Sequence, residues 1–143
     1  MIAATRILTV IGFLLVAAFS CARAQQDTAI SDKDVNVTDF ADLAYPPIAA
    51  TASVQGVVVV RVRLDDQGRV VDALAVSGSP LLISASVRNA RRWRFEPNSQ
   101  KAAIIVYNFR LEGMCPNDGA SSHMVLYPPN LAAITACGRA ARE

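Results

Sequence analysis

Residues 57–77 read VVVVRVRLDDQGRVVDALAVS, the clearest β-hairpin pattern in the chain. β-Branched side chains dominate residues 57–64 and alternate between two faces, which is typical of a strand. The turn formers DDQG follow, and Gly68 is free to take a positive φ. Residues 69–77 continue with period two, and two strands joined by so short a turn must be antiparallel neighbours. The predicted faces are Val58, Val60, Val62 and Leu64 against Val57, Val59, Arg61 and Arg63 in the first strand, and Val70, Asp72, Leu74 and Val76 together in the second.

The sequence on both sides of this hairpin predicts two helices and one further strand. Proline is tolerated at a helix start, so Tyr45-Pro46-Pro47 predicts a short helix over residues 48–54. Residues 81–94 predict an amphipathic helix, which Pro97 and Asn98 stop. Its apolar side chains are Ile83, Val87, Ala90 and Trp93, and those on one face of a last strand, residues 103–111, are Ile105, Tyr107, Phe109 and Leu111. The expected fold is α+β: a three-stranded antiparallel sheet packed against one main amphipathic helix, with a short N-terminal helix.

Composition excludes several classes of function. The chain has 143 residues and a formal net charge of +2, which is too weakly basic for a nucleic-acid binder. Aromatic residues make up 6% of the chain, so a base-stacking platform is not expected. With one histidine, His123, and three cysteines, the chain offers no metal-ligand spacing. We therefore predict no cofactor, no metal and no nucleic-acid partner.

Residues 1–24 are typical of a signal peptide. Arg6 precedes an uncharged run over residues 7–22, and Ala22-Arg23-Ala24 places small residues at the positions that a signal peptidase inspects. We predict export to the periplasm with cleavage after Ala24. Retention as an inner-membrane anchor facing the periplasm is the alternative, and only then is a membrane a partner. Lipid attachment at Cys21 is a third reading, with a poor match in the residues before it.

Export sets the interpretation of the remaining cysteines. Cys115 and Cys137 are the two that follow the signal peptide, and an oxidising compartment favours a disulfide between them. The alternative is a catalytic thiol assisted by His123, for which no third, orienting group is evident.

Charge is distributed unevenly along the exported part. Residues 25–44 carry five aspartates against one lysine, a net charge of −4, and show no apolar period. We predict an acidic flexible or loosely docked arm there. Residues 45–112 carry a net charge of +4, and residues 113–143 are neutral. Either these are solvated faces, or the arm lies against the basic domain until a partner displaces it.

The ordered set of motifs in residues 45–112 resembles the C-terminal domain of TonB-family energy transducers. The set comprises Tyr45-Pro46, a glycine before the valine run, the DQGRV turn, Ser77-Gly78 and, above all, RRWRFEP at residues 91–97. The matching positions are Tyr45, Pro46, Gly56, Gly68, Arg91, Arg92, Trp93, Phe95 and Pro97. We expect Trp93 and Phe95 to lie in the core, and the arginines to be solvated, paired with acids, or available to an acidic partner or lipid headgroups.

The resemblance implies a periplasmic binding module rather than an enzyme. Its partner would be an extended segment of an outer-membrane receptor or another envelope protein, added to the last strand of the sheet. By that analogy the docking edge is Ile104, Val106, Asn108 and Arg110. Arg110 also fits a second role, since a charge on an edge strand discourages aggregation.

The sequence departs from full transducers at both ends. The hydrophobic run lacks the family's membrane histidine, and residues 25–44 lack a proline-rich spacer, so energy transduction by this chain alone is not expected. In residues 113–143, residues 131–136 followed by Gly138 predict a short capped helix, pinned by the disulfide beside the last strand. If this extension covers the docking edge, the module is autoinhibited or has another role.

Two other classes of function compete with receptor binding. A structural or self-associating envelope module would pair its free last strand with a second copy as a homodimer. An enzyme is the third class, but no paired carboxylates, nucleophile elbow or phosphate loop is visible. Ser121-Ser122-His123 has no evident orienting acid.

Overall fold

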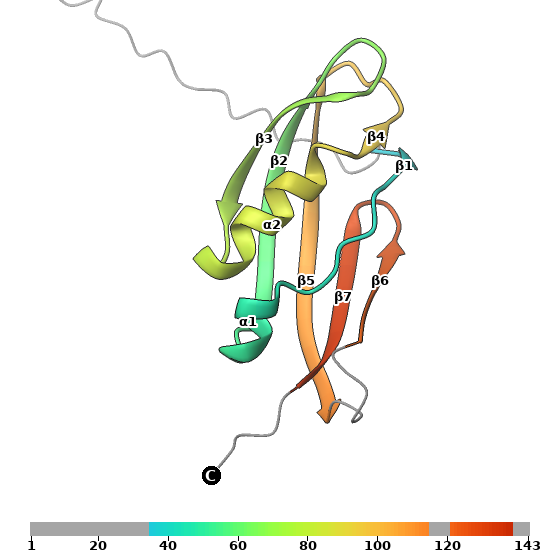
Figure 1. Ribbon diagram of the computed structural model, residues 1–143. Helices are drawn as coiled ribbons and strands as arrows, with labels where there is room; N and C mark the ends of the chain where they lie inside the picture. Colours follow the sequence, from blue (N-terminus) through green and yellow to red (C-terminus); the bar gives the residue numbers. More distant parts are fainter. Residues whose placement is uncertain (1–34, 115–120, 139–143) are drawn as a thin grey trace, which may run out of the picture.

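The computed structural model describes residues 35–114 and 121–138, which form an α+β fold (Figure 1). A five-stranded sheet has the order β3-β2-β5-β7-β6, and β1 and β4 form a separate pair. Neighbouring strands are antiparallel, except that β5 and β7 are parallel. The elements are β1 (Val37–Asp39), α1 (Pro47–Thr51), β2 (Gly56–Leu64), β3 (Val70–Ser77), α2 (Pro80–Ala90), β4 (Arg94–Phe95), β5 (Ala102–Met114), β6 (Ser122–Tyr127) and β7 (Leu131–Gly138).

The sheet has five strands rather than the predicted three, because the C-terminal extension adds a hairpin, β6–β7, beside β5. The helix predicted over residues 131–136 is wrong, since these residues belong to β7. Their side chains alternate between buried and partly buried, which is the period of a strand. Main-chain pairing with β5 outweighs the helix propensity of the alanines. The prolines after Tyr127 lie in the turn between β6 and β7.

The core lies between one face of the sheet and the two helices (Figure 1). The two faces predicted for residues 57–64 are confirmed in β2, where one face is buried, and the alternation predicted for residues 103–111 holds in β5. Buried side chains on these two strands are Val58, Val60, Val62, Leu64, Ala103, Ile105, Tyr107 and Phe109. In β3, Ala73 is buried, whereas Leu74 and Val76 are exposed.

Helix α2 ends at Ala90 and is shorter than predicted. Its buried positions are Leu82, Ser86, Asn89 and Ala90, while the predicted Ile83 and Val87 pack only at the edge of the core. The chain leaves the helix before Trp93, because the N–H of Phe95 donates to the carbonyl of Gly68 at 2.9 Å and draws this segment into β4. Neither α1 nor α2 is long and apolar enough to span a membrane, and no other helix occurs in the described part of the chain.

The described part of the acidic arm, residues 35–44, packs against the domain. Val35 is 1% exposed, and the side chain of Asn36 donates to the carboxylate of Glu96 at 2.8 Å. Strand β1 pairs with β4, and the ring centroids of Phe40 and Trp93 lie 5.8 Å apart. Residues 25–34, the predicted signal peptide and its cleavage site lie outside the described residues.

Candidate functional site: the sheet edges and the basic face

The predicted docking edge on β5 is occupied by β7. Val106 donates its N–H to the carbonyl of Asn130 at 3.0 Å, and the Asn130 side chain donates to the carbonyl of Ile104 at 2.8 Å. Further along, Asn108 and Arg110 are in parallel register with Ala133 and Thr135. The four predicted residues therefore lie along the edge of β5 that faces away from β2, but β7 already pairs with this edge. The chain itself fills the edge that the family resemblance assigned to a partner.

The β6–β7 hairpin is held from the helix face as well. Ala132 and Ile134 are fully buried there, and the backbone N–H of Tyr45 donates to Ser122 Oγ at 3.2 Å. The rings of Tyr45 and Phe109 pack edge to face next to the β5–β7 pair, with their centroids 5.3 Å apart. Burial of these apolar side chains and the main-chain pairing both stabilise the hairpin in the sheet.

Among the strands of residues 35–114 and 121–138, β6 pairs with β7 alone and forms the open edge on this side of the sheet. The N–H of Cys137 donates to the carbonyl of Ser121 at 3.4 Å. In an antiparallel pair, hydrogen-bonded and non-hydrogen-bonded residues alternate, so the odd-numbered residues of β6 bond to β7. The backbone N–H and C=O groups of Ser122, Met124 and Leu126 consequently point away from β7.

The opposite edge, β3, is less regular. Its register with β2 shifts twice, between Val59 and Val60 and between Arg63 and Leu64, and it carries the charged Asp72. Bulges and charges are the usual devices that keep an edge strand from pairing. By contrast, β6 pairs with β7 without a register shift and carries no Lys, Arg, Asp or Glu.

Asn89 joins the docked arm to the core, and sequence reasoning missed it. Its side-chain N–H groups donate to the carbonyls of Ala41 and Asp42 at 2.9 and 3.1 Å. Its carbonyl oxygen accepts from the indole N–H of Trp93 at 2.7 Å and from the Tyr107 hydroxyl at 2.9 Å. All of its hydrogen-bonding groups are thereby used. Burial raises the pKa of Tyr107 far above its ordinary value, so this hydroxyl stays a donor.

The family motifs meet where the β2–β3 turn touches the segment after α2. Trp93 and Phe95 are buried, as predicted, with ring centroids 6.2 Å apart. Gly68 has a φ of +74° and packs against the carbonyl of Phe95. The carboxylate of Asp65 accepts from the N–H of Arg69 at 2.9 Å, and this bond holds its pKa below the ordinary value. The other motif residues are Tyr45, buried beside α1; Pro46, at the start of α1; Gly56, at the start of β2; and Arg91, Arg92 and Pro97, all exposed.

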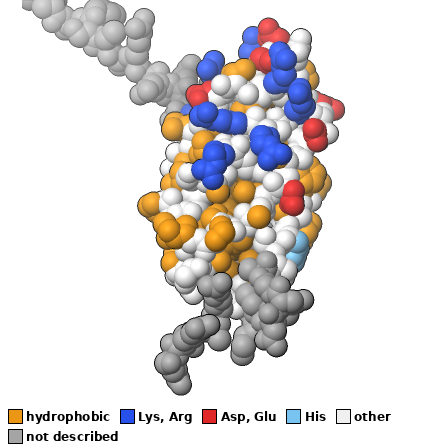
Figure 2. Space-filling view, in the orientation of Figure 1, with side chains coloured by type: hydrophobic (Ala, Val, Ile, Leu, Met, Phe, Trp, Pro, Cys, Tyr) orange, Lys and Arg blue, Asp and Glu red, His pale blue; other side chains and the backbone are white. Residues whose placement is uncertain are grey.

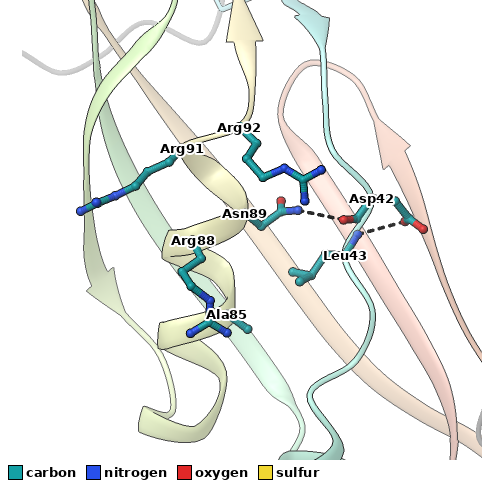
Figure 3. A pocket seen from close by; sticks show the side chains of 7 residues that line it. All are labelled: Asp42, Leu43, Ala85, Arg88, Asn89, Arg91 and Arg92. Carbon is teal, nitrogen blue, oxygen red and sulfur yellow. Dashed lines mark hydrogen bonds between the residues drawn. The ribbon is translucent and has the colours of Figure 1, made fainter.

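Basic side chains gather on the upper half of the helix face (Figure 2). Beside them, a shallow pocket of about 430 Å³ lies between the end of α2 and the docked arm (Figure 3). Its lining residues are Asp42, Leu43, Ala85, Arg88, Asn89, Arg91 and Arg92. Within residues 35–114 and 121–138, none of its three arginines forms an ion pair. Guanidinium groups stay charged and bind carboxylates in a fork, so the pocket suits an acidic side chain.

The predicted disulfide and the rejected catalytic site fall in the C-terminal extension. Cys137 lies in β7 and is disulfide-bonded, but Cys115 lies outside the described residues, so the pairing of these two stays a prediction. His123 lies exposed in β6. Among the residues that the structure describes, no three His, Cys, Asp or Glu side chains come close enough to hold a metal ion.

Comparison with known families gives one match. The family described as Gram-negative bacterial TonB protein C-terminal matches residues 41–111, about half of the chain. The match runs from the docked arm into β5, so β6 and β7 lie beyond it. No curated protein and no solved structure matches the chain significantly.

Proposed function

Because residues 41–111 form a TonB-family C-terminal domain, this is a TonB-like envelope protein linked to TonB-dependent transport, and we propose that it binds an extended protein segment by strand addition. TonB C-terminal domains interact with outer-membrane receptors, so a receptor segment is the first partner, and a segment of another envelope protein is the second. We further propose that it acts as a binding module and not as an enzyme.

The proposal rests on the β6 edge, whose outward main-chain groups are unpaired within the part of the chain that the structure describes. Such an edge forms hydrogen bonds with any extended backbone that fits it, and the side chains at alternate positions select the sequence. The β6 edge offers these groups without a bulge or a charge to block them. We propose that residues 1–24 are a signal peptide, cleaved after Ala24, that directs the chain to the periplasm, where receptor segments are accessible.

We expect extended peptides copied from receptor N-terminal segments to bind the protein purified from the periplasm with dissociation constants of roughly 1–100 μM, the range of small transient interfaces. Isothermal titration calorimetry would measure this affinity. The matched control is the same peptide with alternate backbone amides N-methylated, which removes donors without changing the side chains. If the methylated peptide binds equally well, or if no receptor peptide binds, strand addition is not the function.

Self-association is the second candidate function, and the uncharged β6 edge favours it too, because a second copy can pair there about a two-fold axis. We expect such a module to sediment as a dimer at low micromolar concentration, and its mass to fall on dilution. If the sedimentation mass remains that of a monomer up to about millimolar protein concentration, a biologically useful dimer is excluded.

A further inference from the structure

We propose that the partner strand adds to β6 and not to β5, so that the C-terminal hairpin has moved the docking edge of the domain outward by two strands. This inference rests on the proposed function and specifies its site. The matched family segment ends at Leu111, and the two strands that follow complete the sheet. The docking surface is the outer edge of a segment that the family match does not include.

An incoming strand cannot reach β5 while β7 is in place. The β5–β7 register runs from Val106↔Leu131 to Leu111↔Ala136 and, after a shift, to Met114↔Gly138. Asn130 closes its first end, because it accepts from the N–H of Val106 and donates its side-chain N–H to the carbonyl of Ile104. Ile134, at the middle of β7, is fully buried against the core. Freeing β5 would break this pairing and expose Ile134 before any new hydrogen bond could form.

On the β6 edge, in contrast, no strand or loop of the described residues has to move before a partner strand can pair. Three successive outward residues, Ser122, Met124 and Leu126, each present one N–H and one C=O to the open side. Neither a side-chain nor a loop hydrogen bond to these backbone groups occurs within the described residues. These groups match the spacing of an extended chain, and an extended chain is therefore the occupant that fits them.

The side chains beside this edge define the chemistry of the partner. On the open face of the sheet, Val125 is 42% and Tyr127 is 53% exposed. On the helix face, Met124 and Leu126 are partly buried against the core. A strand added here would place its own side chains next to these on both faces. The fitting segment is consequently about six residues long, uncharged, and apolar or β-branched at successive positions.

The first test locates the edge by hydrogen exchange of the exported protein. In the free protein we expect the amides of Met124 and Leu126 to exchange rapidly. The amides of Val106, bonded to the carbonyl of Asn130, and of Asn108, in register with Ala133 of β7, should exchange slowly. Saturating receptor peptide should slow exchange at Met124 and Leu126 by about tenfold or more. The peptide should leave the exchange rates of the Val106 and Asn108 amides unchanged. Slowing that depends on protein concentration without peptide would assign the edge to a second copy and overturn the proposal.

The second test removes one outward donor. Met124→Pro deletes an N–H that faces solvent, a position where an edge strand tolerates proline. We expect it to weaken peptide binding about tenfold, and Met124→Ala, which keeps the N–H, to weaken it less. Circular dichroism confirms that each variant is folded, and the exchange test requires no variant. Peptide that binds but protects β5, with Met124→Pro neutral, overturns this inference and leaves the proposed function intact; absence of all peptide binding overturns both.

Discussion

Replacing Gly68 with alanine should lower the free energy of unfolding by about 3 kcal/mol or more, a large share of the stability of a small domain. Gly68 has a φ of +74°, and a Cβ built on it would lie 1.8 Å from the carbonyl oxygen of Phe95. That oxygen is backbone, so it cannot move aside as a flexible side chain would. The turn would have to separate from β4, which breaks the 2.9 Å bond from Phe95 N–H to the Gly68 carbonyl.

Gly113→Ala is the matched control for this prediction. Gly113 also has a positive φ, +65°, but a Cβ there meets no atom of the described residues within 4 Å. The left-handed conformation alone costs an alanine about 1–2 kcal/mol, so a loss of that size is expected. Urea unfolding followed by the fluorescence of Trp93, the single tryptophan, measures both variants. Equal losses in the two would show that the contact with Phe95 does not matter.

The hairpin and the last strand of the family domain were predictable from the sequence. Their apolar side chains alternate without interruption, and a strand buried on one face has no other period. The inward positions Val60 and Ile105, for example, are both fully buried as the alternation predicts. Trp93 and Phe95 were identified as core by their size and by their place at the end of a helix.

Strands β6 and β7 could not be predicted from the sequence, because the side chains on the two faces of β7 differ little in size and polarity. Ala132, Ala133 and Ala136 have the same side chain on both faces, so the period of two is hidden and the high helix propensity of alanine misleads. Residues 131–138 form a strand because they pair with the edge of β5, and this pairing is a tertiary contact that the local sequence does not show. The docking edge was therefore assigned one hairpin too early, to the residues that β7 covers.

The contact between the docked arm and Asn89 was predictable in part from the sequence. Asn89 was missed, although it lies seven residues after Leu82 on the same face of α2, where a polar side chain at an apolar position is a signal for a buried hydrogen-bonding role. Its partners on the arm, the carbonyls of Ala41 and Asp42, are backbone groups without a sequence signature. The excess of aspartates concealed this contact, because it indicated a solvated segment.

Asn89→Leu should lower the free energy of unfolding by about 3 kcal/mol, since it leaves buried donors without acceptors at 1–3 kcal/mol each. Leucine has a similar volume, so the indole N–H of Trp93 and the hydroxyl of Tyr107 would lose their shared acceptor without a cavity to admit water. The carbonyls of Ala41 and Asp42 lose their donor at the same time. Urea unfolding with Trp93 fluorescence measures the loss.

The arm should respond to Asn89→Leu before the rest of the domain does. Its backbone is tied to α2 through the Asn89 side chain, so limited proteolysis should cut within residues 35–44 faster than in the unmodified protein, at urea concentrations below the unfolding transition. Ser86→Ala is the control, because Ser86 is equally buried one turn earlier but bonds only to the Leu82 carbonyl within the helix. A loss below about 1 kcal/mol is expected for it. If both variants lose the same stability, or if the arm stays resistant in Asn89→Leu, then burial of the helix rather than the Asn89 bonds holds the arm in place.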